Sequence, residues 1–304
     1  MIRSLRLTDI ATLLLFLGKS PVDEARTRGR LISKKGELLS AIPLLKGCLI
    51  SEDTQQSLIY VHRGLIRGLV CLRRCRGPSA WSIEYLLLAP GHERFCVDLL
   101  GRMSFAGTEI RAERIFLRLD STSPSVDMAK QAGFTHYLTE FLYRSEEARQ
   151  AEPSGLSLVL RTKCSADEHG LFRLYSAATP LQVRCEEGMT LQEWQQGRDR
   201  DASRELVFEG RGEISAWLRI RQNRTAGQFD IVTELGPVEL GQLVNYSLAM
   251  LKGRYPIYCL APEFQQQLRR VLEEQGFYKV AAYACLSKQL AVRVQEPQLV
   301  PLRA

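Results

Sequence analysis

The sequence predicts an α+β protein of two similar domains, each a mixed and mostly antiparallel sheet flanked by helices. One observation is a repeated ending: "KQAGFTHYLTEFLYRS" begins at Lys130, "EEQGFYKVAAYACLSK" begins at Glu273, and both place Gly-Phe between a polar stretch and a β-rich run. A second is an ungapped alignment of the two middle sections, which matches Gly64 with Gly212, Arg73 with Arg221 and Ile83 with Ile231. Self-similarity of this length indicates duplication. A chain of 304 residues is also long for one core.

The first half begins with a short strand that ends before Thr8 and Asp9, either of which can cap the following helix through a side-chain oxygen. Residues 20–36 are polar and are interpreted as a loop or a solvated helix face. Runs rich in β-branched and aromatic residues then predict three antiparallel strands within 57–74 and 79–90. The last four elements are a helix, a strand, a helix and a strand at 93–107, 114–120, 124–132 and 136–144.

The second half repeats this order after an acidic, Pro- and Gly-containing linker at 145–155. A strand and a helix are expected within 156–179, and three strands within 204–235. A helix, a strand, a helix and a final strand follow at 238–253, 255–261, 262–275 and 278–292. Gly133 and Gly276 should end equivalent helices, because glycine tolerates the left-handed conformation of a helix terminus, and Phe134 and Phe277 should be buried beside them.

The composition is that of a globular protein, with 45% hydrophobic and 25% charged residues. No apolar run reaches the 18 or so residues of a membrane helix, and Asp9 interrupts the apolar start, so neither a membrane span nor a signal peptide is expected. The eight cysteines and four histidines are dispersed without zinc-site spacing, which predicts reduced thiols, a cytoplasmic location and no metal centre.

The net charge of +7 raises the question of an anionic partner. The densest basic cluster, "CLRRCRG" at 71–77, lies in a strand-like run, where alternating arginines usually form a solvated face. No recognition helix or aromatic RNA-binding signature accompanies it, so nucleic acid is disfavoured as a partner. A basic module that binds RNA or an acidic protein through this strand stays open as a minor alternative.

The order of elements, together with "YLLLAP" before a helix and "AKQAGF" before a final strand, resembles the GNAT N-acetyltransferase fold. The resemblance covers each half nearly end to end and implies GNAT-like domains at 1–147 and 148–304. It implies that the fourth and fifth strands splay apart, so that the pantetheine arm of acetyl-CoA pairs with strand backbone in the gap. The next helix would then bind the pyrophosphate at its N-terminus, where unpaired N–H groups and the helix dipole favour an anion.

By this resemblance the first half would hold the cofactor. The implied contacts are backbone of Leu87, Leu88 and Ala89 for pantetheine, and Gly91, His92 and Arg94 for the pyrophosphate. Glu84, six residues before Pro90, matches the strand-four carboxylate that acts as general base in the family, and a carboxylate beside an apolar strand suits that role if its pKa is raised. Glu84 could equally point to solvent. Tyr137 or Tyr143 could replace the family's general acid.

The sequence departs from the family pattern in both halves. The glycine-rich phosphate turn is absent, and the places of the family's helix Asn and Tyr hold Thr122 and Ala129 in the first half and Gln265 and Leu272 in the second. Around the turn of the second half, Glu234 and Glu239 would repel phosphates, which favours the first half as the cofactor site. Two hypotheses follow: acetyl transfer from acetyl-CoA to a small-molecule or peptide amine, or an inactive pseudo-acetyltransferase that serves as a binding or scaffold module. The sequence specifies neither the acceptor nor the oligomeric state.

Overall fold

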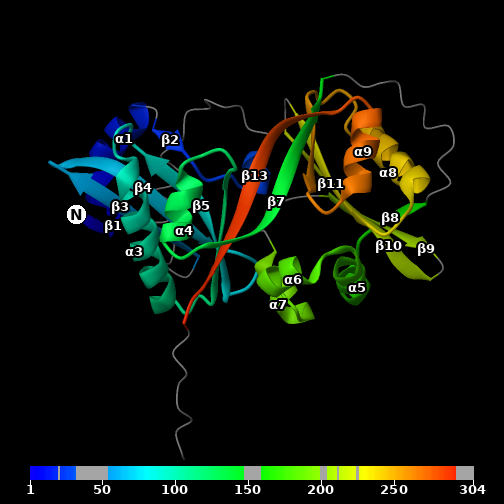
Figure 1. Ribbon diagram of the computed structural model, residues 1–304, viewed down its shortest axis with the longest axis horizontal. Helices are drawn as coiled ribbons and strands as arrows, with labels where there is room; N and C mark the ends of the chain where they lie inside the picture. The colour runs from blue at the N-terminus through cyan, green and yellow to red at the C-terminus, as the bar shows by residue number, and fades with distance from the viewer. Residues whose placement is uncertain are drawn as a thin grey trace, which may run out of the picture.

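A computed structural model describes residues 1–19, 21–31, 54–146, 159–198, 204–210, 212–223 and 226–291 (Figure 1). The elements of the first half are β1 (Ile2–Ser4), η1 (Leu7–Asp9), α1 (Ile10–Gly18), β2 (Val22–Asp23), η2 (Arg28–Arg30), β3 (Gln55–His62), β4 (Leu65–Arg74), β5 (Ala80–Leu88), η3 (Glu93–Phe95), α3 (Cys96–Glu109), β6 (Arg114–Asp120), α4 (Ser125–Gln131) and β7 (Thr135–Ser145). Those of the second half are β8 (Leu160–Thr162), η4 (Ser165–Asp167), α5 (Glu168–Ala178), α6 (Leu181–Glu187), α7 (Leu191–Gly197), β9 (Arg204–Gly210), β10 (Glu213–Gln222), β11 (Gly227–Thr233), α8 (Pro237–Met250), β12 (Ile257–Pro262), α9 (Gln266–Glu274) and β13 (Tyr278–Gln289).

The two halves repeat each other in detail at their starts. In the first half, Asp9 pairs with Arg3 at 2.6 Å and accepts the backbone N–H of Arg6 at 2.9 Å. In the second half, Asp167 pairs with Arg161 at 2.7 Å and accepts the backbone N–H of Cys164 at 2.7 Å. Asp9 therefore closes the turn before α1 by accepting from a residue earlier in the chain, rather than by capping the helix from its side chain.

The repeated Gly-Phe pair ends equivalent helices, as the sequence predicts. Gly133 and Gly276 both have a φ of +86°. The N–H of Phe134 donates to Ala129 O and that of Phe277 to Leu272 O, both at 2.9 Å, which is the six-residue bond of a Schellman helix end. Both phenylalanines are only 3% exposed, so each glycine turns the chain at the point where a buried aromatic ring begins the next strand.

All strands except β2 follow one continuous path in the order β1-β3-β4-β5-β6-β13-β7-β12-β11-β10-β9-β8. Neighbours are antiparallel except β5 with β6 and β11 with β12. The expected mixed, mostly antiparallel architecture flanked by helices is confirmed, but the two sheets are joined. The last strand of each half is exchanged: β13 lies between β6 and β7, and β7 pairs with β12 of the second half (Figure 1).

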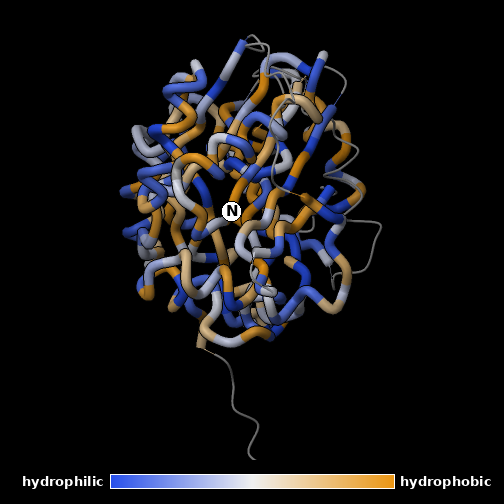
Figure 2. The backbone as a smooth tube through the Cα atoms, turned by 90° about the vertical axis from the view of Figure 1, so that its right-hand side faces the viewer, coloured by the Kyte–Doolittle hydropathy of each residue, from blue (hydrophilic) through white to orange (hydrophobic). Residues whose placement is uncertain are grey.

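The exchange carries side chains from each half into the core of the other. Ala284 and Leu286 of β13 lie in the cluster between the first half's strands and α3, which also contains Leu100 and Met103. Tyr143 of β7 lies in the corresponding cluster beneath α8 and α9. Figure 2 shows hydrophobic and hydrophilic stretches alternating along the chain, as expected for elements that bury one face. The proposed boundary between residues 147 and 148 falls outside the described residues.

Two features differ from the sequence-based expectation. Within 20–36, expected to be a loop or helix face, Val22 and Asp23 form a strand that pairs with β5, and a 3-10 turn follows at Arg28–Arg30. Between α5 and β9 the chain forms two further short helices, α6 and α7. Both insertions place side chains at the junction of the two halves.

Candidate functional site

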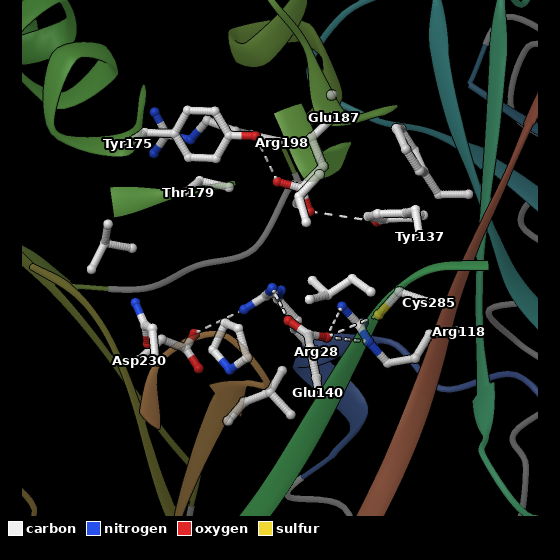
Figure 3. A pocket seen from close by; sticks show the side chains of 18 of the residues that line it. Arg28, Arg118, Tyr137, Glu140, Tyr175, Thr179, Glu187, Arg198, Asp230 and Cys285 are labelled. Carbon is white, nitrogen blue, oxygen red and sulfur yellow. Dashed lines mark hydrogen bonds and ion pairs between the residues drawn. The ribbon is translucent and has the colours of Figure 1, made fainter. Parts of the chain in front are cut away.

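A cavity of about 150 Å³ lies where β11 and β12 diverge. These parallel strands pair only through Gly227–Phe229 and Ile257–Cys259, and residues just beyond the last pair line the cavity. The second half contributes Tyr175, Thr179, Val183, Glu187, Trp194, Gly197, Arg198, Trp217, Arg219, Asp230, Ile231, Val232, Leu260, Pro262, Phe264, Gln265 and Cys285. The first half contributes Arg26, Arg28, Ser82, Phe116, Leu117, Arg118, Tyr137, Leu138 and Glu140 (Figure 3).

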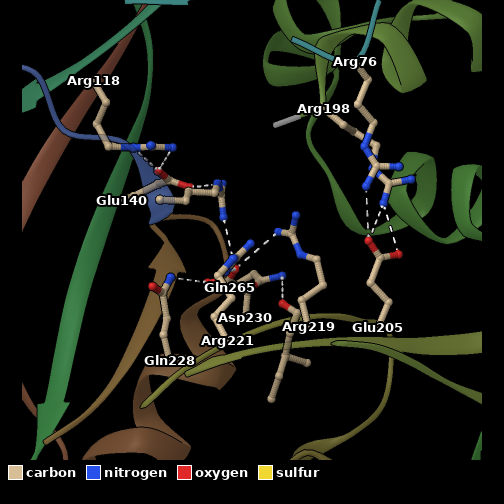
Figure 4. Close-up of polar contacts among 12 residues, drawn as sticks. Arg76, Arg118, Glu140, Arg198, Glu205, Arg219, Arg221, Gln228, Asp230 and Gln265 are labelled. Atoms are coloured by element: carbon tan, nitrogen blue, oxygen red, sulfur yellow. Dashed lines mark hydrogen bonds and ion pairs between the residues drawn. The ribbon is translucent and has the colours of Figure 1, made fainter. Parts of the chain in front are cut away.

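One side of the cavity is a buried ion-pair network centred on Arg28 (Figure 3), and Figure 4 shows its members Arg118, Glu140 and Asp230. The Arg28 guanidinium pairs with Glu140 and lies 3.7 Å from Asp230, while Arg118 pairs with Glu140 at 2.7 Å. Arg219 and Arg221 also pair with Asp230, at 3.6 and 2.5 Å. Burial alone would raise the pKa of Glu140 and of Asp230, but the surrounding guanidiniums outweigh it and hold both pKa values below their ordinary range. These carboxylates therefore stay ionised and paired.

The opposite side carries a carboxylate in a different environment. Glu187, the last residue of α6, accepts hydrogen bonds from Tyr175 Oη at 3.0 Å and from Tyr137 Oη at 3.5 Å (Figure 3). Among the described residues no arginine or lysine is ion-paired with it. Desolvation therefore dominates and raises the pKa of Glu187. The same desolvation raises the pKa of both tyrosines, so they remain neutral donors.

Gln265 and Trp217, which line the cavity, each carry a buried polar atom that has no hydrogen-bond partner within the described chain. Gln265 uses its Nε2 to bond Ile231 O across the gap at 3.3 Å, but its Oε1 accepts nothing. Trp217 is 3% exposed, and its indole Nε1–H donates to nothing. Because unpaired buried polar groups are unfavourable, such atoms in a cavity wall are suited to a polar ligand.

The corresponding gap in the first half is filled by the chain itself. β5 and β6 pair through Ala80–Ser82 and Arg114–Phe116 and then diverge. The segment that includes β2 runs between them: Glu24 N–H donates to Leu86 O at 2.9 Å, and Arg26 N–H donates to Arg118 O at 2.9 Å. This segment occupies the position that the resemblance assigned to the pantetheine arm.

The backbone groups of the first half that were predicted to contact pantetheine already form hydrogen bonds within the chain. Leu87 pairs with Asp23 and Leu88 with Val22, while Ala89 N–H donates to Arg67 O at 2.8 Å. Binding of pantetheine to these predicted residues would therefore require β2 to leave.

The residues of the predicted phosphate-binding turn in the first half also contact other groups of the chain. Gly91 has a φ of +78°, and its N–H donates to the Glu93 carboxylate at 2.9 Å. His92 Nδ1 lies 3.3 Å from Pro90 O, and the Arg94 guanidinium stacks 4.8 Å from the ring centroid of Phe95. A carboxylate thus lies at the turn where the resemblance placed phosphate.

The three predicted catalytic side chains lie apart from one another. Glu84 is ion-paired with Arg73 of the neighbouring strand at 3.0 Å and does not line the cavity. Tyr143 donates to Glu273 at 2.9 Å within the second core, and burial raises its pKa to about 12. Tyr137 does line the cavity, where it meets Glu187.

Sequence reasoning missed Glu187, Arg28, Glu140 and Asp230. Glu187 had a detectable signal, since "PLQVRCEEG" from Pro180 reads as a short helix that ends at a glycine. No local sequence signal marked Arg28, because its ion-pair partners Glu140 and Asp230 lie 112 and 202 residues further along the chain.

The joined sheets, the two diverging strand pairs and the helices that follow them define a tandem GNAT fold. Solved structures with this fold cover nearly the whole chain. They include a putative acetyltransferase from Pyrococcus horikoshii (13% identity, 97% of this chain and 91% of that chain, TM-score 0.56). A second is a GCN5-related N-acetyltransferase from Sphaerobacter thermophilus (14% identity, 95% of this chain and 95% of that chain, TM-score 0.55). A third is a tandem GNAT protein from the clavulanic acid biosynthesis pathway (13% identity, 95% of this chain and 98% of that chain, TM-score 0.54). No protein-family model and no curated protein matches the chain.

These similarities confirm the fold of tandem GNAT proteins, which the sequence pattern had indicated. Within the described part of the chain, none of the helices is both long enough and apolar enough to span a bilayer.

Proposed function

We propose that the protein is an acyl-CoA-dependent N-acyltransferase whose acyl donor, acetyl-CoA, enters between β11 and β12 of the second half. The observation that carries this proposal is the difference between the two gaps. The gap between β5 and β6 is filled by the β2 segment, whereas the gap between β11 and β12 leads into the cavity. An extended ligand arm can pair with a strand edge in the same way that β2 pairs with β5.

The thioester end of the donor fits the residues present. Gln265 holds the Ile231 carbonyl through Nε2 and leaves Oε1 free of partners in the described chain, so its amide can accept from an N–H of the pantetheine arm. Tyr137 lies in the same cavity and is our candidate for the acid that protonates the leaving thiolate. Its raised pKa keeps it protonated at neutral pH. Glu84, paired with Arg73 outside the cavity, is not part of this proposal.

At the pyrophosphate end, the carboxylate of Glu239 lies at the helix N-terminus and opposes binding of an anion. α8 begins after Gly236 with no side-chain cap, so its first N–H groups are available to an anion. The carboxylate of Glu239 lies over this turn, since a Cβ placed on Gly236 would be 3.2 Å from Glu239 Oε2. This negative charge weakens the attraction of the helix N-terminus for phosphate.

The test is titration calorimetry of acetyl-CoA with three variants. Glu239→Gln should bind about two- to fivefold more tightly, because it removes a charge worth up to about 1 kcal/mol at a helix end. Gln265→Ala should bind more weakly. Arg94→Glu is the matched control in the first half and should leave the affinity unchanged. Loss of binding in Arg94→Glu, with no effect of Glu239→Gln, would move the site to the first half.

The second candidate function is an inactive binding or scaffold module. One observation favours it: in both halves a glutamate, Glu93 or Glu239, lies at the turn where phosphate would bind. Under this alternative neither wild type nor Glu239→Gln binds acetyl-CoA at millimolar concentration.

A further inference from the structure

Among the described carboxylates of the cavity wall, Glu187 is the one that forms no ion pair, although the charges of Arg28 and Arg118 act on it from beyond ion-pair distance. Glu140 and Asp230 each contact two or more guanidiniums, whereas Glu187 meets two tyrosine hydroxyls. A partly buried carboxylate without a cationic partner is unfavourable in its ionised form. A positively charged ligand group in the cavity would supply the missing partner.

The residues packed around Glu187 fix its position. Gly188 ends α6 with a φ of +143°, and a Cβ there would come within 2.4 Å of the Trp194 backbone nitrogen. The chain after Glu187 therefore packs directly against α7. Tyr175 is 6% exposed, and its ring lies tilted against that of Trp194 with the centroids 5.5 Å apart, which holds its hydroxyl at the Glu187 carboxylate. A group held this way has the rigidity that a binding residue needs.

We propose that Glu187 binds the ammonium group of a small primary amine, the acyl acceptor, and takes a proton from it. This inference rests on the proposed acyl transfer for its chemistry, but amine binding can be measured without an acyl donor. The acceptor is small, because a cavity of about 150 Å³ holds roughly a benzene-sized group. The aromatic side chains of Trp194, Trp217 and Phe264 in the wall suit an alkyl or aryl body behind the ammonium.

The bound ammonium gives one proton to the Glu187 carboxylate and becomes a neutral amine. The amine nitrogen bonds to the thioester carbonyl carbon, and the C–S bond breaks. The nitrogen loses a second proton to solvent as the amide forms. The departing thiolate takes one proton, either directly from solvent or from Tyr137, which solvent then reprotonates. The products are an N-acyl amine and a thiol, with one net proton released to solvent when Glu187 ionises again.

The test is the binding of n-butylamine to the full-length protein without acetyl-CoA, followed by ligand-observed NMR. 1-Butanol, which has the same size and no charge, is the neutral control ligand. Wild type should bind the amine at least tenfold more tightly than the alcohol, and Glu187→Gln should remove this preference. Glu186→Gln is the matched control, because Glu186 is the adjacent carboxylate, bonds Ser287 Oγ at 2.6 Å and does not line the cavity.

A second measurement uses wild type alone and stands even where Glu187→Gln fails to fold. The charged and titratable groups facing Glu187 are Tyr175 from α5, Tyr137 and Glu140 from β7, Arg118 from β6 and Arg28 from η2. The arginines stay charged, the tyrosines stay neutral and Glu140 stays ionised between about pH 5 and 8. Protonation of Glu187 removes its charge, and burial raises its pKa, so Glu187 takes up its proton at a higher pH than an exposed glutamate does. Amine affinity should therefore fall as pH is lowered from 8 and Glu187 becomes protonated.

The outcomes separate this inference from the proposed function. Equal binding of n-butylamine and 1-butanol by wild type, an amine preference that persists in Glu187→Gln, or a wild-type amine affinity that stays constant from pH 8 to pH 4.5 overturns the role of Glu187 even if acetyl-CoA binds. Failure of acetyl-CoA to bind, with the amine preference present and dependent on Glu187, overturns the acyltransferase proposal and leaves Glu187 as a cation-binding residue.

Discussion

The guanidinium of Arg28 pairs with the carboxylate of Glu140, which lies 112 residues later in the chain, and the same guanidinium lies 3.7 Å from Asp230 of the second half. Arg28 therefore links β7 to β11 across the junction that forms the cavity. Its side chain is 16% exposed and that of Glu140 is fully buried, so this pair is only weakly screened by solvent.

Replacing Arg28 by methionine should lower the free energy of unfolding by about 3 kcal/mol, because it leaves two buried carboxylates short of a cation. The measurement is urea denaturation at pH 7. Arg73→Met is the control, since Arg73 is 51% exposed and its pair with Glu84 should contribute less than about 1 kcal/mol. Equal losses in the two variants would contradict a structural role for the network.

Acid should unfold the protein through the same network. The pKa values of Glu140 and Asp230 lie below their ordinary values in the folded state, so the folded chain binds fewer protons than the unfolded chain in acid. The stabilisation is present above the unfolded pKa of about 4 and is lost as pH falls below it. Denaturation midpoints measured from pH 6 to pH 3 should drop steeply below about pH 4.5. Arg28→Met should flatten this dependence, and an unchanged slope would argue against the assignment.

Proline at position 24 should loosen the segment that fills the first gap. Glu24→Pro removes the N–H that donates to Leu86 O, which should reduce the free energy of unfolding by about 1–3 kcal/mol relative to Glu24→Ala. The alanine variant is the control because it loses the same side chain, including its contact with Ser123 Oγ, but keeps the N–H. Acetyl-CoA affinity should be the same in both variants, since the proposed donor site is in the second half. A large gain of affinity in Glu24→Pro would show instead that the first gap binds the donor once it is opened.

The two halves should fold only together. β13 lies between β6 and β7 and pairs with both. A fragment of residues 1–150 therefore lacks the strand that joins its β6 to its β7. We expect separately expressed fragments 1–150 and 151–304 to be poorly folded by circular dichroism, and co-expressed fragments to co-purify. A 151–277 fragment, which lacks β13, should fail to capture the first half. Independent, cooperatively unfolding monomers of each half would contradict this expectation.

Local signals predicted much of the fold. Gly133 and Gly276 end equivalent helices because the left-handed turn and the following buried phenylalanine are properties of adjacent residues. The candidate site was predicted far less well. Tyr137 lies in the cavity, but Glu84 is paired on the sheet and the β5 edge is engaged by β2. The short Val22–Asp23 strand follows no hydrophobic alternation, so nothing within it indicates which strand edge it meets.

The sequence by itself determined the duplication, the order of the strands and helices that the two halves share, and the turns that separate them, because these depend on periodicity and on glycine conformations within a few residues. Only the tertiary structure decided that β7 and β13 change places, that β2 fills one gap while the other stays open, and that Glu187 lacks a cation where Glu140 has two. The physical reason is that a strand's pattern specifies its buried face but not its hydrogen-bonding neighbour. The charge state of a buried carboxylate likewise depends on cations that distant segments bring within a few ångströms.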